Sequence, residues 1–274
     1  MSTVMTAPVI ERYNRRVQAV NSLLCVGLDS QHDRLPARFQ TSATPQFDFN
    51  RWIIEQTHAY ASAYKPNIAF YEARGERGLA ELKLTLDYLR AEHPDILTIC
   101  DAKRADIGST NVGYVAEIFD WMGFDAVTLH PYLGREALTP FLERADKGSI
   151  ILCRTSNPGA GELQDLDVGG APLWQRVAET VRDHWNANGN CMLVTGATYP
   201  DEMRTIRALA PHMPLLVPGI GAQGGDVAAT VRAGQDARGG GLIINAARAV
   251  IFDADPAEAA RRYRDEINQH RRVL

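Results

Sequence analysis

The sequence predicts an α/β protein built as one (β/α)8 (TIM) barrel. Short apolar segments typical of buried strands alternate with amphipathic segments that have helical spacing. The alternation repeats eight times without a Pro/Ser-rich linker, and 274 residues are a usual length for one such barrel. We therefore expect a single domain over residues 1–274. A doubly wound open sheet is the alternative, because periodicity alone does not distinguish it from a closed barrel.

The eight predicted strands are apolar segments that are each followed by a helical pattern. In chain order they are 23–29, 63–70, 96–103, 125–131, 148–156, 191–197, 214–221 and 241–247. Intervening segments such as LAELKLTLDYLRAEH carry apolar residues three and four positions apart, as in a helix with one buried face. Residues 8–21, which contain ERYNRRVQAV, are expected to form an extra N-terminal helix that closes the bottom of the barrel.

Composition favours a small soluble ligand. The chain is 45% hydrophobic, and its formal net charge of -4 gives no indication of a nucleic-acid or membrane partner. The N-terminus is too polar for a signal peptide, and no apolar segment approaches the roughly 18 residues of a membrane helix. The four cysteines, which lie in apolar segments without metal-binding spacing, are Cys25, Cys100, Cys153 and Cys191. We expect buried, reduced thiols and a cytoplasmic protein.

Polar residues gather at the C-terminal ends of the predicted strands, which is where such barrels carry their active sites. They include Asp29, Lys65, Asn67, Asp101, Lys103, His130, Ser156, Asn157, Thr195, Thr198, Gly221, Gln223, Asn245 and Arg248. The site is therefore expected at this end. His130 and Asn245 are more simply explained as residues that satisfy the backbone or a neighbour.

The segment ILTICDAKRADIGST ends a buried strand in charged residues. Side-chain alternation places Asp101 and Lys103 on one face and turns Arg104 away. With Lys65 and Asp106 they would form a network of alternating charge. Taken singly, Asp106 could cap the next helix and Lys65 could pack its stem on a neighbour.

A lysine held between two carboxylates suits one chemistry better than others. It is kept protonated, so it can stabilise a developing carbanion and deliver a proton. A Schiff-base lysine would instead be desolvated or lie beside another cation, and a magnesium site would not hold an ammonium group among its oxygen ligands.

The segment PGIGAQGGD (218–226) indicates a phosphate site. Its GxGxxG pattern does not favour a dinucleotide, because it follows the seventh strand instead of opening an early βαβ unit. The loops after strands 7 and 8 are the usual phosphate site of this fold. Gln223 can donate an amide hydrogen bond, and Arg248 can offer a charged fork.

The segment DAKRADIGST resembles the D-x-K-x-x-D signature of the orotidine 5′-phosphate decarboxylase family, in the form of its longer bacterial subgroup. The resemblance covers nearly the whole chain. It includes LDS after strand 1, KPN in strand 2, TSNPGA after strand 5, PGIGAQGGD and the arginine after strand 8.

This resemblance implies a cofactor-free and metal-free decarboxylation of orotidine 5′-monophosphate to UMP, in de novo pyrimidine biosynthesis. It also implies a homodimer with shared active sites. The implied catalytic tetrad is Lys65, Asp101, Lys103 and Asp106, with Lys103 protonating carbon 6. The implied substrate contacts are Asp29 and Lys65 to the ribose, Ser156 to the pyrimidine, and Gln223 and Arg248 to the phosphate. Pro218 and Gly221 are also implied to bind the substrate. Ile107 and Thr110, with Asp106, would reach into the partner's site.

Two rival functions remain open. Magnesium-dependent sugar-phosphate enzymes of the same suprafamily share the strand-3 signature but have a carboxylate where this chain has Lys65. A catalytically inactive barrel that binds a nucleotide as a sensor is expected to lack a tetrad member, and none is missing here.

Overall fold

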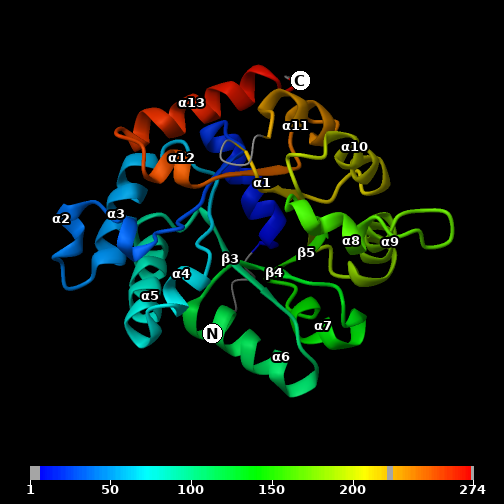
Figure 1. Cartoon of the computed structure of the whole chain (residues 1–274), viewed down its shortest axis with the longest axis horizontal. Coiled ribbons are helices and arrows are strands. Elements are labelled where there is room, and N and C mark those ends of the chain that lie inside the picture. The colour runs from blue at the N-terminus through cyan, green and yellow to red at the C-terminus, as the bar shows by residue number, and fades with distance from the viewer. Residues whose placement is uncertain (1–6, 221–224, 273–274) are drawn as a thin grey trace.

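Eight parallel strands close into a barrel in chain order, with β8 pairing back onto β1. This computed structural model describes residues 7–220 and 225–272. The strands converge in the middle of the molecule and the helices surround them (Figure 1). The predicted (β/α)8 barrel is therefore confirmed, and the open doubly wound sheet is excluded. The strands are β1 Leu24–Val26, β2 Ala63–Tyr64, β3 Leu97–Arg104, β4 Ala126–Leu129, β5 Gly148–Arg154, β6 Cys191–Thr195, β7 Leu215–Val217 and β8 Leu242–Ala246.

Most strands end earlier than the apolar segments predicted. The prediction for 63–70 was wrong in its second half, because Pro66 has no N–H to donate and helix α4 (Ala69–Glu72) begins soon afterwards. Lys65 and Asn67 therefore follow β2 instead of lying late in it, although Asn67 still forms an isolated bridge to Asp101. The strand predicted over 214–221 ends at Val217, directly before Pro218.

Helices follow each strand and pack their apolar faces on the barrel. In α13, for example, Ala259, Ala260 and Ile267 are buried. Helices α6 and α9 continue as π-helical turns over Ala116–Met122 and Val181–Trp185. The helices between β1 and β5 are α2 Ala37–Gln40, α3 Pro45–Thr57, α4 Ala69–Glu72, α5 Gly75–Glu92, α6 Gly108–Val115 and α7 Gly134–Leu142. Those after β5 are α8 Gly161–Gln164, α9 Leu173–Thr180, α10 Pro200–Leu209, α11 Val227–Gly234, α12 Arg248–Ile251 and α13 Pro256–Gln269.

A helix that precedes the first strand, α1 (Val9–Val20), covers the N-terminal end of the barrel. The Tyr13 hydroxyl donates to the backbone oxygen of Leu242, at the start of β8. Arg12 pairs with Asp125, the residue before β4, at 2.8 Å. One end of the barrel is thereby closed, and the C-terminal strand ends remain available for a site.

All four cysteines are buried free thiols, as predicted. Burial raises the pKa of Cys25, Cys153 and Cys191 to about 12, so these thiols stay protonated at neutral pH. Within residues 7–220 and 225–272, no helix is both long enough and apolar enough to span a membrane.

Candidate active site

A cavity of about 460 Å³ opens at the C-terminal ends of the strands. Seven predicted site residues line it, namely Asp29, Lys65, Asp101, Lys103, Ser156, Pro218 and Arg248. Gly221 and Gln223 lie outside the residues that the structure describes. Most of the expected side chains therefore lie in one cavity, although they come from six different strand ends.

Asp101 is the centre of the charged cluster. Its Oδ2 accepts a hydrogen bond from Lys65 Nζ at 2.8 Å, and its Oδ1 accepts one from Lys103 Nζ at 2.6 Å. The Lys65 side chain is only 5% exposed and that of Asp101 12%, whereas that of Lys103 is 50% exposed. One ammonium group is thus fixed in the wall, and the other reaches into the cavity opening.

Lys65 and Asp101 stay ionised because the neighbouring opposite charges favour the charged forms by more than burial disfavours them. Burial alone would lower the pKa of Lys65, but Asp101 and Asp29 raise it above its usual value. Burial would likewise raise the pKa of Asp101, but Lys65 and Lys103 hold it well below its usual range. At neutral pH Lys65 is therefore a cation and Asp101 an anion.

A bulge in β3, and not simple alternation, sets the position of Lys103. The pairing of β3 with β4 runs from Cys100 opposite Val127 to Arg104 opposite Leu129, so β3 contains two extra residues. Lys103 adopts a left-handed backbone with φ 47°. The prediction that Lys103 and Asp101 are neighbours is correct, but its physical reason was incomplete.

Thr128, which belongs to none of the sequence motifs above, holds this bulge. Its hydroxyl oxygen accepts from the backbone N–H groups of Ala102 at 3.1 Å and Lys103 at 2.9 Å, and the hydroxyl donates to Asp101 Oδ1 at 3.0 Å. The one sign of this role in the sequence is that Thr128 is a polar residue in the middle of the apolar segment DAVTLHP, which forms the strand next to β3.

Asp29 presents a carboxylate with spare hydrogen-bonding capacity. Among the described residues, its buried Oδ1 has no hydrogen-bond partner. Burial raises the pKa of Asp29, and Asp101 adds to this, while Lys65 acts in the opposite direction. A partnerless buried acceptor that lines a cavity is suited to receive hydroxyl groups from a ligand.

Asp106, Ile107 and Thr110 are not among the residues that line this cavity. Asp106 Oδ1 accepts from the backbone N–H of Ile107 at 2.7 Å, and its own N–H donates to the buried Asn111 side chain at 2.8 Å. Ile107 is 60% exposed. Within one chain, the cluster therefore contains three members of the predicted tetrad and not the fourth.

The remaining candidates have local partners. His130 Nε2 lies 3.0 Å from the backbone oxygen of Ala105, and Asn245 Oδ1 accepts from the Cys25 thiol at 3.5 Å. Both contacts match the simple explanation given for them, although Asn245 also lines the cavity. Arg104 pairs with Glu72, away from Asp101, as predicted.

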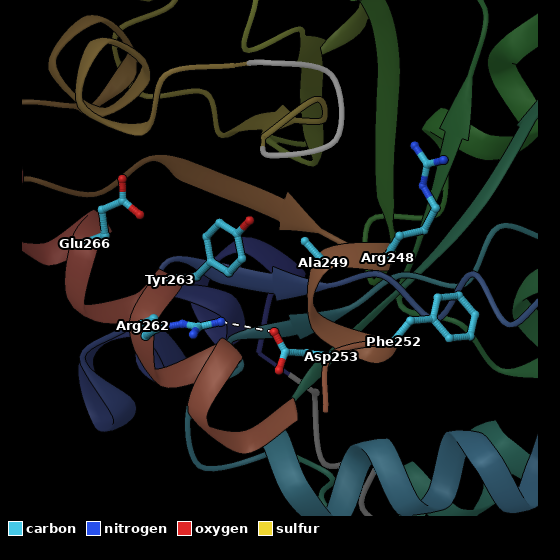
Figure 2. A pocket seen from close by; sticks show the side chains of 7 residues that line it. All are labelled: Arg248, Ala249, Phe252, Asp253, Arg262, Tyr263 and Glu266. Carbon is cyan, nitrogen blue, oxygen red and sulfur yellow. Dashed lines mark hydrogen bonds and ion pairs between the residues drawn. The ribbon is translucent and has the colours of Figure 1, made fainter. Parts of the chain in front are cut away.

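Arg248 lies between this cavity and a second one. The second cavity, of about 500 Å³, is lined by residues of α12, of α13 and of the segment between them. Arg262 pairs there with Asp253 at 3.1 Å (Figure 2). In Figure 2 the Arg248 guanidinium is directed away from this pair. The first cavity is the candidate active site, because the strand ends and the charged cluster line it and not the second.

Comparisons with known proteins identify the family of the chain. The family model described as orotidine 5′-phosphate decarboxylase / HUMPS family matches residues 22–263. The chain is 51% identical over 257 residues to the orotidine 5′-phosphate decarboxylase of Cellvibrio japonicus, covering 92% of this chain and 93% of that protein. It is 49% identical over 261 residues to that of Azoarcus sp., covering 93% and 96%.

Solved structures show the same likeness. The OMP decarboxylase of Leishmania donovani is 40% identical and superposes with a TM-score of 0.87 over 96% of this chain and 98% of that one. A protein from Streptomyces avermitilis, described as a putative orotidine 5′-phosphate decarboxylase, is 31% identical with a TM-score of 0.81 over 98% of each chain.

Proposed function

The chain belongs to the orotidine 5′-phosphate decarboxylase / HUMPS family, and on that premise we propose that it converts orotidine 5′-monophosphate into UMP and carbon dioxide. This reaction serves pyrimidine biosynthesis. The observation that carries the proposal is the row of charges formed by Lys65, Asp101 and Lys103 at the mouth of the barrel. A magnesium-dependent sugar-phosphate site would have a carboxylate in place of Lys65.

The chemistry needs a cation at the carbon that loses its carboxylate. The bond from carbon 6 to the carboxyl carbon breaks, its electron pair stays on carbon 6, and carbon dioxide leaves. The Lys103 ammonium stabilises this carbanion and then donates a proton to carbon 6, after which water reprotonates the amine. Asp101 lies beside the departing carboxylate and, with Lys65 behind it, keeps the Lys103 ammonium in position. No cofactor takes part.

The remaining cavity residues bind the parts of the substrate that do not react. Asp29 and Lys65 bind ribose hydroxyls, and the spare acceptor capacity of Asp29 supports this role. Ser156 binds the pyrimidine. Arg248 binds the phosphate together with the 218–226 segment, which contributes Pro218, Gly221 and Gln223. Binding energy from the phosphate, which does not react, is expressed at carbon 6.

The active site is completed in a homodimer. Asp106, Ile107 and Thr110 reach into the partner's site, where Asp106 supplies the fourth charge of the tetrad. Exposed apolar side chains near α6 and α7, two helices that contact each other, support an interface there. They are Ile107 at 60%, Val112 at 57%, Tyr132 at 84% and Leu133 at 44% exposure.

Two further proposals concern the subgroup of the family and the location of the protein in the cell. We place the chain in the longer bacterial subgroup of the family, and bacterial relatives that match over 92% or more of this chain support that placement. A cytoplasmic location stays a prediction, based on the sequence composition.

Product analysis tests the activity. Purified protein is incubated with orotidine 5′-monophosphate in buffer that contains a metal chelator, and UMP and carbon dioxide are quantified. Equal product yields with and without the chelator are expected. Turnover of a ketose phosphate that requires magnesium would favour the sugar-phosphate enzyme, and UMP binding without any turnover would favour the inactive nucleotide-binding barrel.

A further inference from the structure

A buried arginine lies directly before the cavity residues of β5. Arg154 is 3% exposed and ends the strand, one residue before Thr155 and two before Ser156. The pairing of β5 with β6 shifts between Leu152 and Arg154. Alternation would put Leu152 and Arg154 on one face, yet Leu152 lines the cavity and Arg154 does not. The irregularity therefore directs Arg154 outward and Thr155 inward.

The guanidinium of Arg154 joins two loops that follow neighbouring strands. It lies 3.2 Å from Asp165, in the segment after β5, and 3.9 Å from Glu202 in α10, which follows β6. It also lies 3.8 Å from the ring centroid of Tyr199, directly before α10. A buried cation is costly unless it is paired, so these contacts resist separation of the two loops.

Gln164 connects Arg154 to Thr155 in the cavity wall. Its Oε1 accepts from the Thr155 N–H at 2.9 Å and lies 3.5 Å from an Arg154 nitrogen. Its Nε2 donates to the Thr155 hydroxyl oxygen at 2.8 Å, and that hydroxyl donates to Asn157 Oδ1 at 2.6 Å. Both neighbours of Ser156 are thereby fixed by hydrogen bonds.

Ser156 is also held from behind. The Gly196 N–H donates to the Arg154 carbonyl at 2.8 Å. A Cβ atom at Gly196 would lie 2.7 Å from the Ser156 Cβ, so only glycine allows this approach. The backbone at Arg154 and the side chain of Ser156 therefore pack against the same short segment after β6.

We propose that Arg154 is a positioning residue that holds Ser156 in the conformation that binds the pyrimidine, acting through Gln164, Thr155 and Asp165. This inference rests on the proposed function, since it assigns Ser156 to the pyrimidine. Arg154 itself does not line the cavity. Among the described residues its buried Nε has no hydrogen-bond partner. Since an unpaired buried donor lowers stability, a stabilising role alone does not explain why an arginine is buried here.

A double-mutant cycle tests the coupling. Arg154→Met is expected to lower kcat/KM about tenfold in the parent protein, equivalent to roughly 1.4 kcal/mol. In a Ser156→Ala background the same change is expected to cost less than about twofold. Asp165→Asn, which changes an exposed partner of Arg154, is a second variant that should show a smaller loss with the same dependence on Ser156. If Arg154→Met lowers kcat/KM by the same factor in the parent and in the Ser156→Ala background, the two residues are not coupled and the proposal is overturned.

Ligand binding separates positioning from general damage. Arg154→Met is expected to weaken UMP binding about tenfold but ribose 5-phosphate binding less than about twofold, because ribose 5-phosphate has no pyrimidine. Arg207→Met is the matched control, since Arg207 is also buried but donates to the backbone oxygens of Gly234, Met213 and Gly241. Arg207→Met should change the affinities for UMP and for ribose 5-phosphate by similar factors. Equal weakening of both by Arg154→Met would contradict the proposal.

The ligand-binding comparison can be made whether or not the protein decarboxylates orotidine 5′-monophosphate. Absence of turnover in the parent protein would overturn the proposed function, and the binding comparison would still measure whether Arg154 supports recognition of the pyrimidine. Turnover in the parent with unchanged kinetics and binding in Arg154→Met would overturn only the positioning role.

Discussion

The Lys103 ammonium lies 2.6 Å from the carboxylate of Asp101, a residue of the same strand, and Lys103 reaches it from a left-handed backbone. Only one other non-glycine residue in the described chain, Asn21, has a positive φ. A lysine in this conformation costs about 1–2 kcal/mol relative to a relaxed backbone. The strain lies at the residue proposed to donate the proton, where the bulge directs the side chain into the cavity.

This strain can be measured with two variants that both remove the amine. Lys103→Gly tolerates a positive φ, whereas Lys103→Ala does not, so the glycine variant is expected to be more stable by about 1 kcal/mol. Urea unfolding of the two proteins gives the difference in free energy. An alanine variant at least as stable as the glycine variant would show that the backbone at this position is not strained.

Loss of Lys65 should destabilise the protein in a pH-dependent manner. Lys65→Met leaves Asp101 and Asp29 buried without the shared ammonium, which is expected to cost about 3–5 kcal/mol at neutral pH. The depressed pKa of Asp101 contributes stability that is present above its ordinary pKa and is lost as pH falls through its folded value. Without Lys65 these carboxyl groups take up a proton more readily.

The deficit of Lys65→Met should therefore be smaller at about pH 5 than at about pH 8. The free energy of unfolding of variant and parent is compared at both pH values by urea titration. Lys83→Met, which removes a surface lysine paired with Asp87, is the control and should show little change. A deficit that does not depend on pH would argue against the charge coupling.

Asp29 should oppose folding at neutral pH. Its folded pKa is raised, so its contribution to stability is present below the unfolded pKa and is lost as pH rises through the folded pKa. Asp29→Asn is thus expected to unfold at a higher temperature than the parent at neutral pH, while binding UMP more weakly. The gain in Tm should disappear toward about pH 3. A lower Tm at neutral pH would mean that the ionised carboxylate stabilises the fold.

The proposed sharing of active sites across a homodimer predicts complementation between two inactive variants. In a hybrid dimer of Lys103→Ala and Asp106→Asn protomers, one of the two sites has both Lys103 and the partner's contribution intact. Random mixing is therefore expected to restore about a quarter of the parental activity. Each variant alone is the control. No recovery in verified hybrid dimers would place Asp106 in its own protomer's site or outside the mechanism.

The sequence predicted the eight strands and the end of the barrel that carries the candidate site, because buried parallel strands and their polar C-terminal ends have a clear pattern. It did not predict the strand ends well. The segment AYKPNIAF (63–70), for example, is mostly apolar and was predicted as one strand. Pro66 and the helix that begins at Ala69 end the pairing of β2 with its neighbouring strands before Lys65.

Three features of the candidate site could not be predicted from the sequence. The bulge at Lys103 depends on the pairing with β4, and Thr128 contributes only a hydroxyl within an otherwise apolar strand. Arg154 would face the cavity by alternation, and only the shifted pairing with β6 shows that it does not. Such irregularities arise from contacts between strands, which a local sequence pattern does not encode.

The most direct test of the proposed mechanism follows ultraviolet absorbance when orotidine 5′-monophosphate is added to the parent protein and to Lys103→Ala, both in chelator-containing buffer. A rapid loss of absorbance with the parent and none with the variant is the predicted result, because only the parent has the cation that stabilises and protonates carbon 6. No loss with the parent, or an equal rate with the variant, would contradict a metal-free decarboxylation that depends on Lys103.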